Sequence, residues 1–165
     1  MQRPHSHGDD DTAMAKIVVG VDGSSGALEA LRWALAEARL RRASVHAVHA
    51  WMLPFSLSVP TLETFGLPAP GPTMEKVHEE LRSRAEADLA ASLQAIGFED
   101  VELTGEAIEG RAALVLLEAA RDADLLVVGS RGRGGFAGLL LGSVSQQCAH
   151  HASCLIVIVP TSEQR

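Results

Sequence analysis

The chain has 165 residues, of which 47% are hydrophobic and 21% charged, and its formal net charge is −7 at pH 7. This length and composition fit a single globular domain with a full core. Only Lys16 and Lys76 are lysines. Proteins that bind phosphate backbones rely on clustered basic residues, so the composition argues against a nucleic-acid partner.

The cysteine pattern and the absence of targeting signals suggest a compartment. Cys148 and Cys154 form neither a CxxC motif nor a disulfide framework, which suits a reducing environment. The sequence has no apolar run of about 18 residues, and its N-terminus lacks the basic and then apolar pattern of a secretory signal. We therefore expect a cytoplasmic protein without a membrane segment.

The first part of the chain predicts a tail followed by a strand. Residues 1–13 are polar and acidic and contain no large apolar side chain apart from Met1, so we expect a disordered tail, with the domain over 14–161. Residues 16–22, KIVVGVD, form a continuous apolar run rich in valine. Such a run is typical of a strand that is covered on both faces.

A helix and a second strand follow. From Ser25 onward, apolar residues recur at helical spacing. Residues 44–51, SVHAVHAW, predict a strand. His46 and His49 are three positions apart on it and so face opposite sides, which excludes a shared metal ion.

The middle of the chain predicts a long connection, a long helix and an edge strand. Residues 52–72 contain five of the seven prolines, and we expect this connection to be a mobile cover. An apolar stripe predicts a helix from Met74 to about Ile96, with Gly97 as its stop. Residues 101–108 alternate more weakly, which indicates a strand nearer an edge of the sheet.

The last third of the chain repeats the alternation of helix and strand. Residues 111–123 predict a helix, 124–130 a buried strand, 143–151 a short helix and 153–160 the final strand. Five strands thus alternate with four helices, a pattern that builds a parallel sheet with helices on both faces. We therefore expect a single-domain, doubly wound α/β fold.

In such folds ligands bind beyond the carboxyl ends of the strands, where the winding reverses. Asp22 ends the first predicted strand, and Gly129 lies at the end of the fourth. If these two strands are neighbours, Asp22 faces the segment after Gly129 across one crevice. That segment, GSRGRGGFAGLLLGSVSQQ, has six glycines among its nineteen residues.

The glycines of this segment predict an anion site. Gly129 and Gly132 let the backbone approach a ligand closely, and the helix that opens at Gly142 offers unpaired amides and a partial positive charge. The hydroxyls of Ser143 and Ser145 can donate hydrogen bonds, and the nearby side chains of Arg131 and Arg133 can add positive charge. A plain turn capped by Ser143 is the alternative, but it leaves most of the glycines without a cause.

Two common phosphate motifs do not fit. A Walker A loop requires GxxxxGK followed by Ser or Thr, and the segment has no lysine. GRGGFA, residues 132–137, matches GxGxxA, but it follows a late strand and no acidic residue lies some 20 positions further on. A dinucleotide site is therefore disfavoured.

The spacing of Gly129, Gly132, Gly142 and Ser143 fits another pattern, in which glycine, two residues, glycine, nine residues, glycine and serine follow one another. With MAKIVVGVDGS, VHAVHAW and the closing LIVIVP, it resembles the universal stress protein family over nearly all of residues 14–160.

The resemblance implies an α/β sandwich that binds one ATP or AMP molecule per subunit, usually as a homodimer. It assigns Asp22 to the ribose and to a magnesium ion, and the backbone near Ala50 and Val128 to the border of the adenine. The remaining residues that it assigns to the nucleotide are Gly129, Arg131, Gly132, Gly142, Ser143, Val144 and Ser145.

The sequence favours binding over catalysis. It contains no GxSxG elbow, no metal-spaced cluster of His and Cys and no Walker lysine. We expect an ATP-binding regulator or sensor of stress that dimerises through its last strand, Leu155 to Val159, because an apolar edge strand needs a cover. A slow ATPase that uses the same site and, more distantly, a flavodoxin-like FMN carrier are the alternatives.

Overall fold

The computed structural model describes residues 15–53, 73–97, 100–134 and 140–161. The predicted tail and most of the predicted cover over 52–72 lie outside the described residues. So do Gly135 and Gly138 of the glycine-rich segment.

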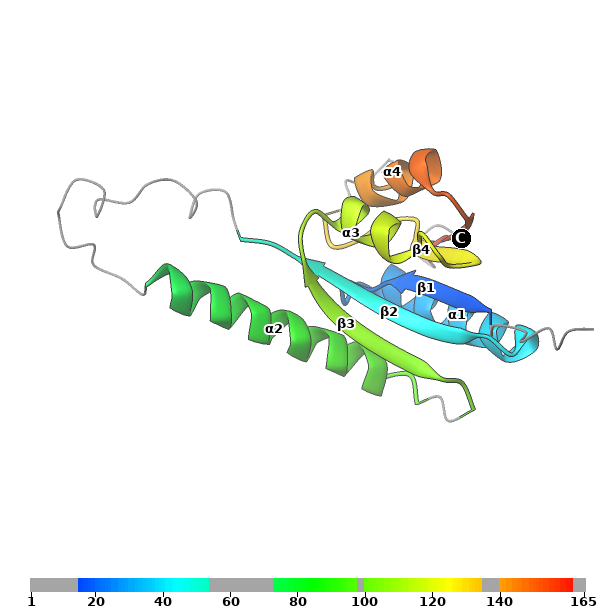
Figure 1. Ribbon diagram of the computed structural model, residues 1–165, viewed down its shortest axis with the longest axis horizontal. Coiled ribbons are helices and arrows are strands. Elements are labelled where there is room, and N and C mark those ends of the chain that lie inside the picture. Colours follow the sequence, from blue (N-terminus) through cyan, green and yellow to red (C-terminus); the bar gives the residue numbers. More distant parts are fainter. Residues whose placement is uncertain (1–14, 54–72, 98–99, 135–139, 162–165) are drawn as a thin grey trace, which may run out of the picture.

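Five parallel strands form one sheet in the order β3-β2-β1-β4-β5 (Figure 1). Their bounds are β1 Lys16–Gly20, β2 Ser44–Trp51, β3 Leu103–Glu109, β4 Leu125–Gly129 and β5 Leu155–Val159. The valine-rich strand β1 is central, and Val18 and Val19 are fully buried. The predicted doubly wound α/β fold is confirmed. The winding reverses between β1 and β4, so these two strands are neighbours, as the predicted position of the ligand site required.

Within the described residues, four helices cover the two faces of the sheet (Figure 1). Helices α1, Ser25–Arg41, and α2, Met74–Gln94, lie on one face, and α3, Ala112–Ala119, and α4, Ser143–His151, lie on the other. Each face has its own apolar cluster. One cluster contains Leu31 and Leu35 of α1, and the other contains Leu116 of α3.

Strand β2 distributes its side chains between these clusters. Ala47 belongs to the cluster under α1 and α2, whereas Val48 belongs to the cluster under α3. The same alternation sends the two histidines of the strand to opposite faces, as predicted. His46 lies 3.0 Å from Thr104 Oγ1 through its Nδ1, and His49 is buried.

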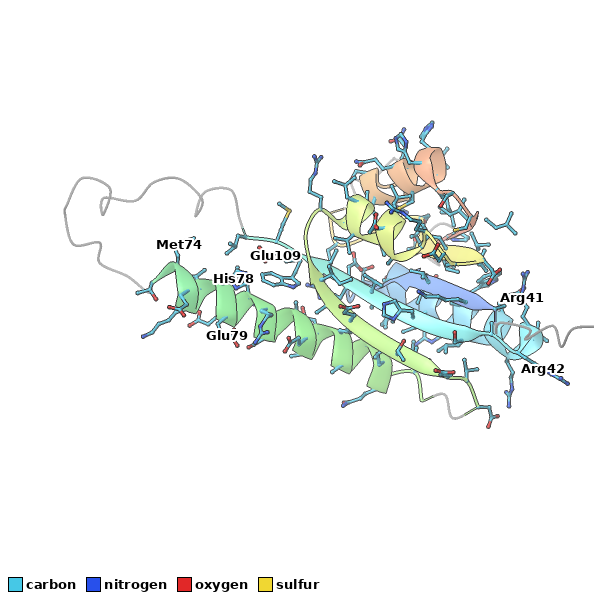
Figure 2. All side chains as sticks on the ribbon, in the orientation of Figure 1. Arg41, Arg42, Met74, His78, Glu79 and Glu109 are labelled. Carbon is cyan, nitrogen blue, oxygen red and sulfur yellow. The ribbon has the colours of Figure 1, made fainter. Side chains whose placement is uncertain are left out.

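The buried residues of helix α2 all lie in its second half. Ala85, Leu89 and Ser92 are its buried residues, and the first half projects beyond the sheet (Figure 1). Near this projecting end, His78 Nε2 lies 2.9 Å from Glu109 Oε2 at the end of β3 (Figure 2). Gly97 follows the helix with a positive φ of 55°, so the predicted stop is present.

Helix α3 is shorter than the predicted helix over 111–123 and ends at Ala119. The reason is a tight turn, in which the Arg121 amide donates to the Glu118 carbonyl (3.1 Å) and the Ala123 amide to the Ala120 carbonyl (3.1 Å). These hydrogen bonds span three residues instead of four and end the α-helix. The chain then enters β4.

Candidate functional site

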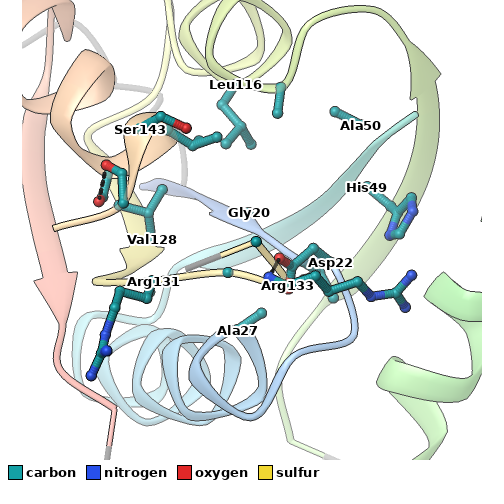
Figure 3. A pocket seen from close by; sticks show the side chains of 18 of the residues that line it. Gly20, Asp22, Ala27, His49, Ala50, Leu116, Val128, Arg131, Arg133 and Ser143 are labelled. Carbon is teal, nitrogen blue, oxygen red and sulfur yellow. Dashed lines mark hydrogen bonds between the residues drawn. The ribbon is translucent and has the colours of Figure 1, made fainter. Parts of the chain in front are cut away.

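A cleft with a volume of about 330 Å³ opens at the carboxyl ends of β1, β2 and β4 (Figure 3). All ten residues that were assigned to the site from the sequence line this one cleft: Asp22, Ala50, Val128, Gly129, Arg131, Gly132, Gly142, Ser143, Val144 and Ser145. They come from strands β2 and β4, the segment that follows β1, helix α4 and the segment between β4 and α4. The fold thus brings together positions up to 123 residues apart, from Asp22 to Ser145.

The cleft has an apolar wall, of which the sequence analysis found only Val128. Ala112 and Leu116 of α3 form it together with Val48 and Val128 of the neighbouring strands. Gly20 also lines this region, and a Cβ at Gly20 would lie 2.9 Å from Leu116 Cδ1. The apolar stripe of α3 was visible in the sequence. Which of its residues line the cleft depends on how α3 packs against the sheet, and this could not be predicted.

Asp22 joins two backbone segments on the polar side of the cleft by hydrogen bonds. Its Oδ1 accepts a hydrogen bond from the Ser24 amide (2.9 Å), and its Oδ2 accepts one from the Arg133 amide (3.0 Å). A Cβ at Gly132 would lie 2.3 Å from Oδ2. The glycine at 132 is therefore needed for the contact between the segment after β4 and the end of β1.

Helix α4 begins at the cleft with uncapped amides. Its first intrahelical hydrogen bond runs from the Gln146 amide to the Gly142 carbonyl (3.0 Å), and no side chain of the described residues caps the helix. The amides of Ser143, Val144 and Ser145 precede that bond. We call these three amides the seat. They carry no formal charge, but their partial positive charge suits an anion. Helix α1 differs, because Ser24 Oγ accepts from the Ala27 amide (3.2 Å).

Ser145 supports this helix start and does not point a free donor into the cleft. Its hydroxyl lies 2.9 Å from the Ser130 carbonyl oxygen and 2.9 Å from that of Gly142, and the residue is buried. The Gly142 amide also donates to the Ser130 carbonyl (2.7 Å). Of the two serines predicted to offer hydroxyls, the exposed Ser143 is the one whose hydroxyl makes no hydrogen bond within the described residues.

The two arginines of the segment do not point at the helix start. Figure 3 shows the guanidinium groups of Arg131 and Arg133 directed away from Ser143, on different sides of the cleft. Arg133 instead pairs with Asp88 of α2, its Nη2 lying 3.1 Å from Oδ2. The seat at α4 is therefore built from backbone amides, and the positive charge that we expected from these side chains is not directed at it.

His49 lies at the end of the cleft nearest α2 and was not assigned to the site from the sequence. It is 6% exposed. Burial lowers the pKa of the imidazole, and the Arg133 charge lowers it further, while Asp88 and Asp22 act in the opposite direction. The ring is thus kept neutral near pH 7.

Among the described residues that line the cleft, Asp22 is the single carboxylate available to a metal ion. Within the described ranges, no three His, Cys, Asp or Glu residues are grouped to hold a metal. Asp22 could contribute one ligand, because each carboxylate oxygen uses one of its lone pairs for an amide and keeps another. This fits magnesium, which commonly takes one or two carboxylates together with phosphate oxygens and waters.

Comparison with known proteins finds similar sequences and structures. The model of the universal stress protein family matches residues 14–160. A universal stress protein of Mycolicibacterium smegmatis is 35% identical over 156 residues, which cover 93% of this chain and 49% of that protein. The chain thus spans about half the length of the curated relatives it matches.

Solved structures agree with this result. The universal stress protein UspA from Lactobacillus plantarum shares the fold with a TM-score of 0.70 and 19% identity, over 89% of this chain and 99% of that one. A universal stress protein crystallised in complex with cAMP has a TM-score of 0.55 and 28% identity, over 91% of this chain and 99% of that one. Over the described part of this chain, no helix is long and apolar enough to cross a membrane.

Proposed function

This chain belongs to the universal stress protein family, and from that premise we propose that it binds ATP in the cleft and regulates a stress response as a homodimer. One observation carries the proposal. The apolar wall around Leu116 and Val128 and the uncapped start of α4 lie in the same cleft. A nucleotide needs both surfaces, one for the base and one for the phosphates.

The base is proposed to lie against the apolar wall. Leu116 and Val128 are buried side chains that line the cleft, and the end of β2 at Ala50 offers backbone groups at its border. A flat, apolar ring gains free energy by leaving water for such a wall. The related protein that was crystallised with cAMP supports adenine as the base.

The phosphates are proposed to lie at the start of α4. The amides of Ser143, Val144 and Ser145 and the hydroxyl of Ser143 supply donors, and the backbone of Gly129 and Gly132, which lines the cleft, borders the ligand. The negative charge of the phosphates offsets the unpaired positive end of the helix. Arg131 lines the cleft with its backbone in this arrangement.

Asp22 is proposed to bind the ribose hydroxyls and a magnesium ion. Its carboxylate is held in place by two amides, so it meets the ligand without losing further side-chain freedom. Magnesium, when bound, would neutralise phosphate charge. Among the described residues, we identify no general base beside the seat. Binding is therefore proposed over efficient hydrolysis, and slow ATP hydrolysis is the second candidate.

The dimer is proposed to form through β5. This strand is at the edge of the sheet, and Leu155 on it is 69% exposed. A free apolar edge invites pairing with another strand, and the same strand of a second copy is the proposed partner. The thiols Cys148 and Cys154 are free, which supports the reducing, cytoplasmic location that we propose.

Isothermal titration with ATP and magnesium tests the site. Gly142→Ala together with Ser143→Ala should weaken ATP binding at least about tenfold, or about 1.4 kcal/mol. The fold should tolerate the change, because a Cβ at Gly142 meets its nearest atoms at 3.5 Å, an ordinary contact. Ser153→Ala, on the exposed turn before β5, is the control and should bind as wild type does.

The result separates the candidates. Unchanged ATP affinity in a variant that unfolds at the wild-type urea concentration would remove the α4 start from the site. Titrations with AMP, cAMP and GTP then establish which nucleotide is preferred. Release of labelled phosphate from ATP by the wild type, lost in Asp22→Ala, would favour the slow ATPase.

A further inference from the structure

Asp88 lies outside the cleft, yet its carboxylate reaches a residue of the cleft wall. Its Oδ2 accepts a hydrogen bond of 3.1 Å from Nη2 of Arg133. Ala85, Leu89 and Ser92, on the same half of α2, are buried. Asp88 is therefore fixed by the packing of α2 against the sheet, independently of the glycine-rich segment that it contacts.

Arg133 is held at both of its ends. Its amide donates to Asp22 Oδ2 (3.0 Å) at the end of β1, and its guanidinium pairs with Asp88 on α2. Between these ends the side chain lies on Gly23, where a Cβ would be 2.4 Å from Nη2. Gly23 also has a positive φ of 78°. Both this backbone conformation and the contact with Arg133 therefore favour glycine at this position. One arginine thus ties the segment after β4 to two other elements.

His49 lies close to this ion pair. Figure 3 shows the guanidinium of Arg133 beside the ring of His49, which is buried. The charges that act on this ring are those of Arg133, Asp88 and Asp22. These four side chains form one compact polar cluster at the end of the cleft near α2, and its position is set by α2.

We propose that Asp88 is a positioning residue for the nucleotide site and acts through the guanidinium of Arg133. This inference rests on the function proposed above. The amides of the segment after β4 bind a ligand best when the segment is already in its bound conformation, because ordering a loop on binding costs affinity. Asp88 reduces that cost without touching the ligand.

The expected effect is modest, because both partners are partly exposed, with 54% of the Arg133 side chain and 31% of the Asp88 side chain accessible. Loss of a partly exposed ion pair typically changes an equilibrium constant by about two- to fivefold. Asp88→Asn should therefore weaken the binding of ATP with magnesium by about two- to fivefold. Asp88→Glu keeps the charge and should restore most of the affinity.

The control is Glu80→Gln. Glu80 is an exposed acid on the same helix for which no ion pair is found among the described residues, so its loss changes the net charge equally and should leave ATP affinity unchanged. Arg133→Gln should weaken binding as well. The double variant Asp88→Asn with Arg133→Gln should bind no more weakly than Arg133→Gln alone, because the two residues act through one contact.

Hydrogen exchange of the Arg133 amide in the free protein gives a second readout. The amide is bonded to Asp22, and its exchange should be faster in Asp88→Asn than in Glu80→Gln. Unchanged ATP affinity in Asp88→Asn, or fully additive losses in the double variant, would overturn the proposal. A wild-type protein that binds no adenine nucleotide would overturn the proposed function instead, and faster exchange would then still support positioning of the segment by Asp88.

Discussion

Gly129, the last residue of β4, lies against the backbone of Gly26 in the first turn of α1. A Cβ at Gly129 would come within 3.0 Å of both the carbonyl carbon and the carbonyl oxygen of Gly26. Backbone atoms in a helix cannot move aside as the end of a flexible side chain can. The glycine at 129 is therefore a requirement of the fold, in addition to any part it has in binding a ligand.

Gly129→Ala should accordingly destabilise the protein. Forcing a methyl group against packed backbone typically costs about 1–3 kcal/mol, and urea denaturation should show a loss of this size. Gly134→Ala is the control, because a Cβ there meets nothing within 4 Å, and its effect should stay within about 0.5 kcal/mol. Equal stabilities of the two variants would show that β4 and α1 are less closely packed than described.

Leu155→Lys should shift the protein from dimer to monomer. A charged side chain on an edge strand opposes pairing with a second chain, and Leu155 is 69% exposed in the single chain, so its replacement should leave the monomer folded. Sedimentation of the wild type and the variant over a range of concentrations measures the change. Leu114→Lys on α3, at 59% exposure, is the matched control and should remain dimeric. A wild type that is monomeric at all concentrations would contradict the dimer.

His49 should make stability depend on pH. Its pKa in the folded protein is lowered by burial and then by Arg133, so below about pH 6.5 the unfolded chain binds a proton that the folded chain resists. The free energy of unfolding should therefore fall as the pH falls from about 6.5 toward the folded-state pKa. Above pH 6.5 this contribution vanishes, because His49 is neutral in both states.

The measurement compares wild type with His49→Asn by urea denaturation between pH 7.5 and pH 5. Asparagine does not titrate in this range, so the wild type should lose more stability than the variant as the pH falls. Identical slopes would mean that the His49 ring accepts its proton equally well in the folded and unfolded chains.

Cys148 should be unreactive in the folded protein. Burial raises the pKa of its thiol to about 11, so about one thiol in a thousand is ionised at pH 8, and the thiolate is the reactive form. Alkylation with iodoacetamide, followed by mass spectrometry, should modify Cys148 only after denaturant is added. The more accessible Cys154 serves as the internal comparison and should react first. Rapid modification of native Cys148 would contradict its burial.

Periodicity was enough to predict the strands and helices. The valine-rich run at β1 is apolar at every position because both faces of that strand are covered, and the stripe of α1 reports a single covered face. Strict alternation then gave the parallel sheet, and the reversal of winding placed Asp22 opposite Gly129. This reasoning needs only local patterns and the geometry of parallel connections.

Other parts of the cleft could not be predicted. Arg131 and Arg133 were expected to bring charge to the seat at α4, and both point elsewhere (Figure 3). Leu116 looked like an ordinary core residue of a helix. Its second role, as a wall of the cleft, follows from where α3 docks on the sheet.

The amino-acid sequence alone determined the order of the elements and the edge at which the cleft opens, because apolar spacing and glycine spacing are local properties of the chain. The family resemblance supplied ten of the residues that line the cleft. Only the tertiary structure decided where the long side chains go. The Arg133 side chain meets Asp88, which is 45 positions away along the chain, and the Arg133 backbone amide meets Asp22, which is 111 positions away. A flexible side chain takes the direction of its best partner, and partners so far apart in sequence become neighbours only when the sheet and α2 have packed.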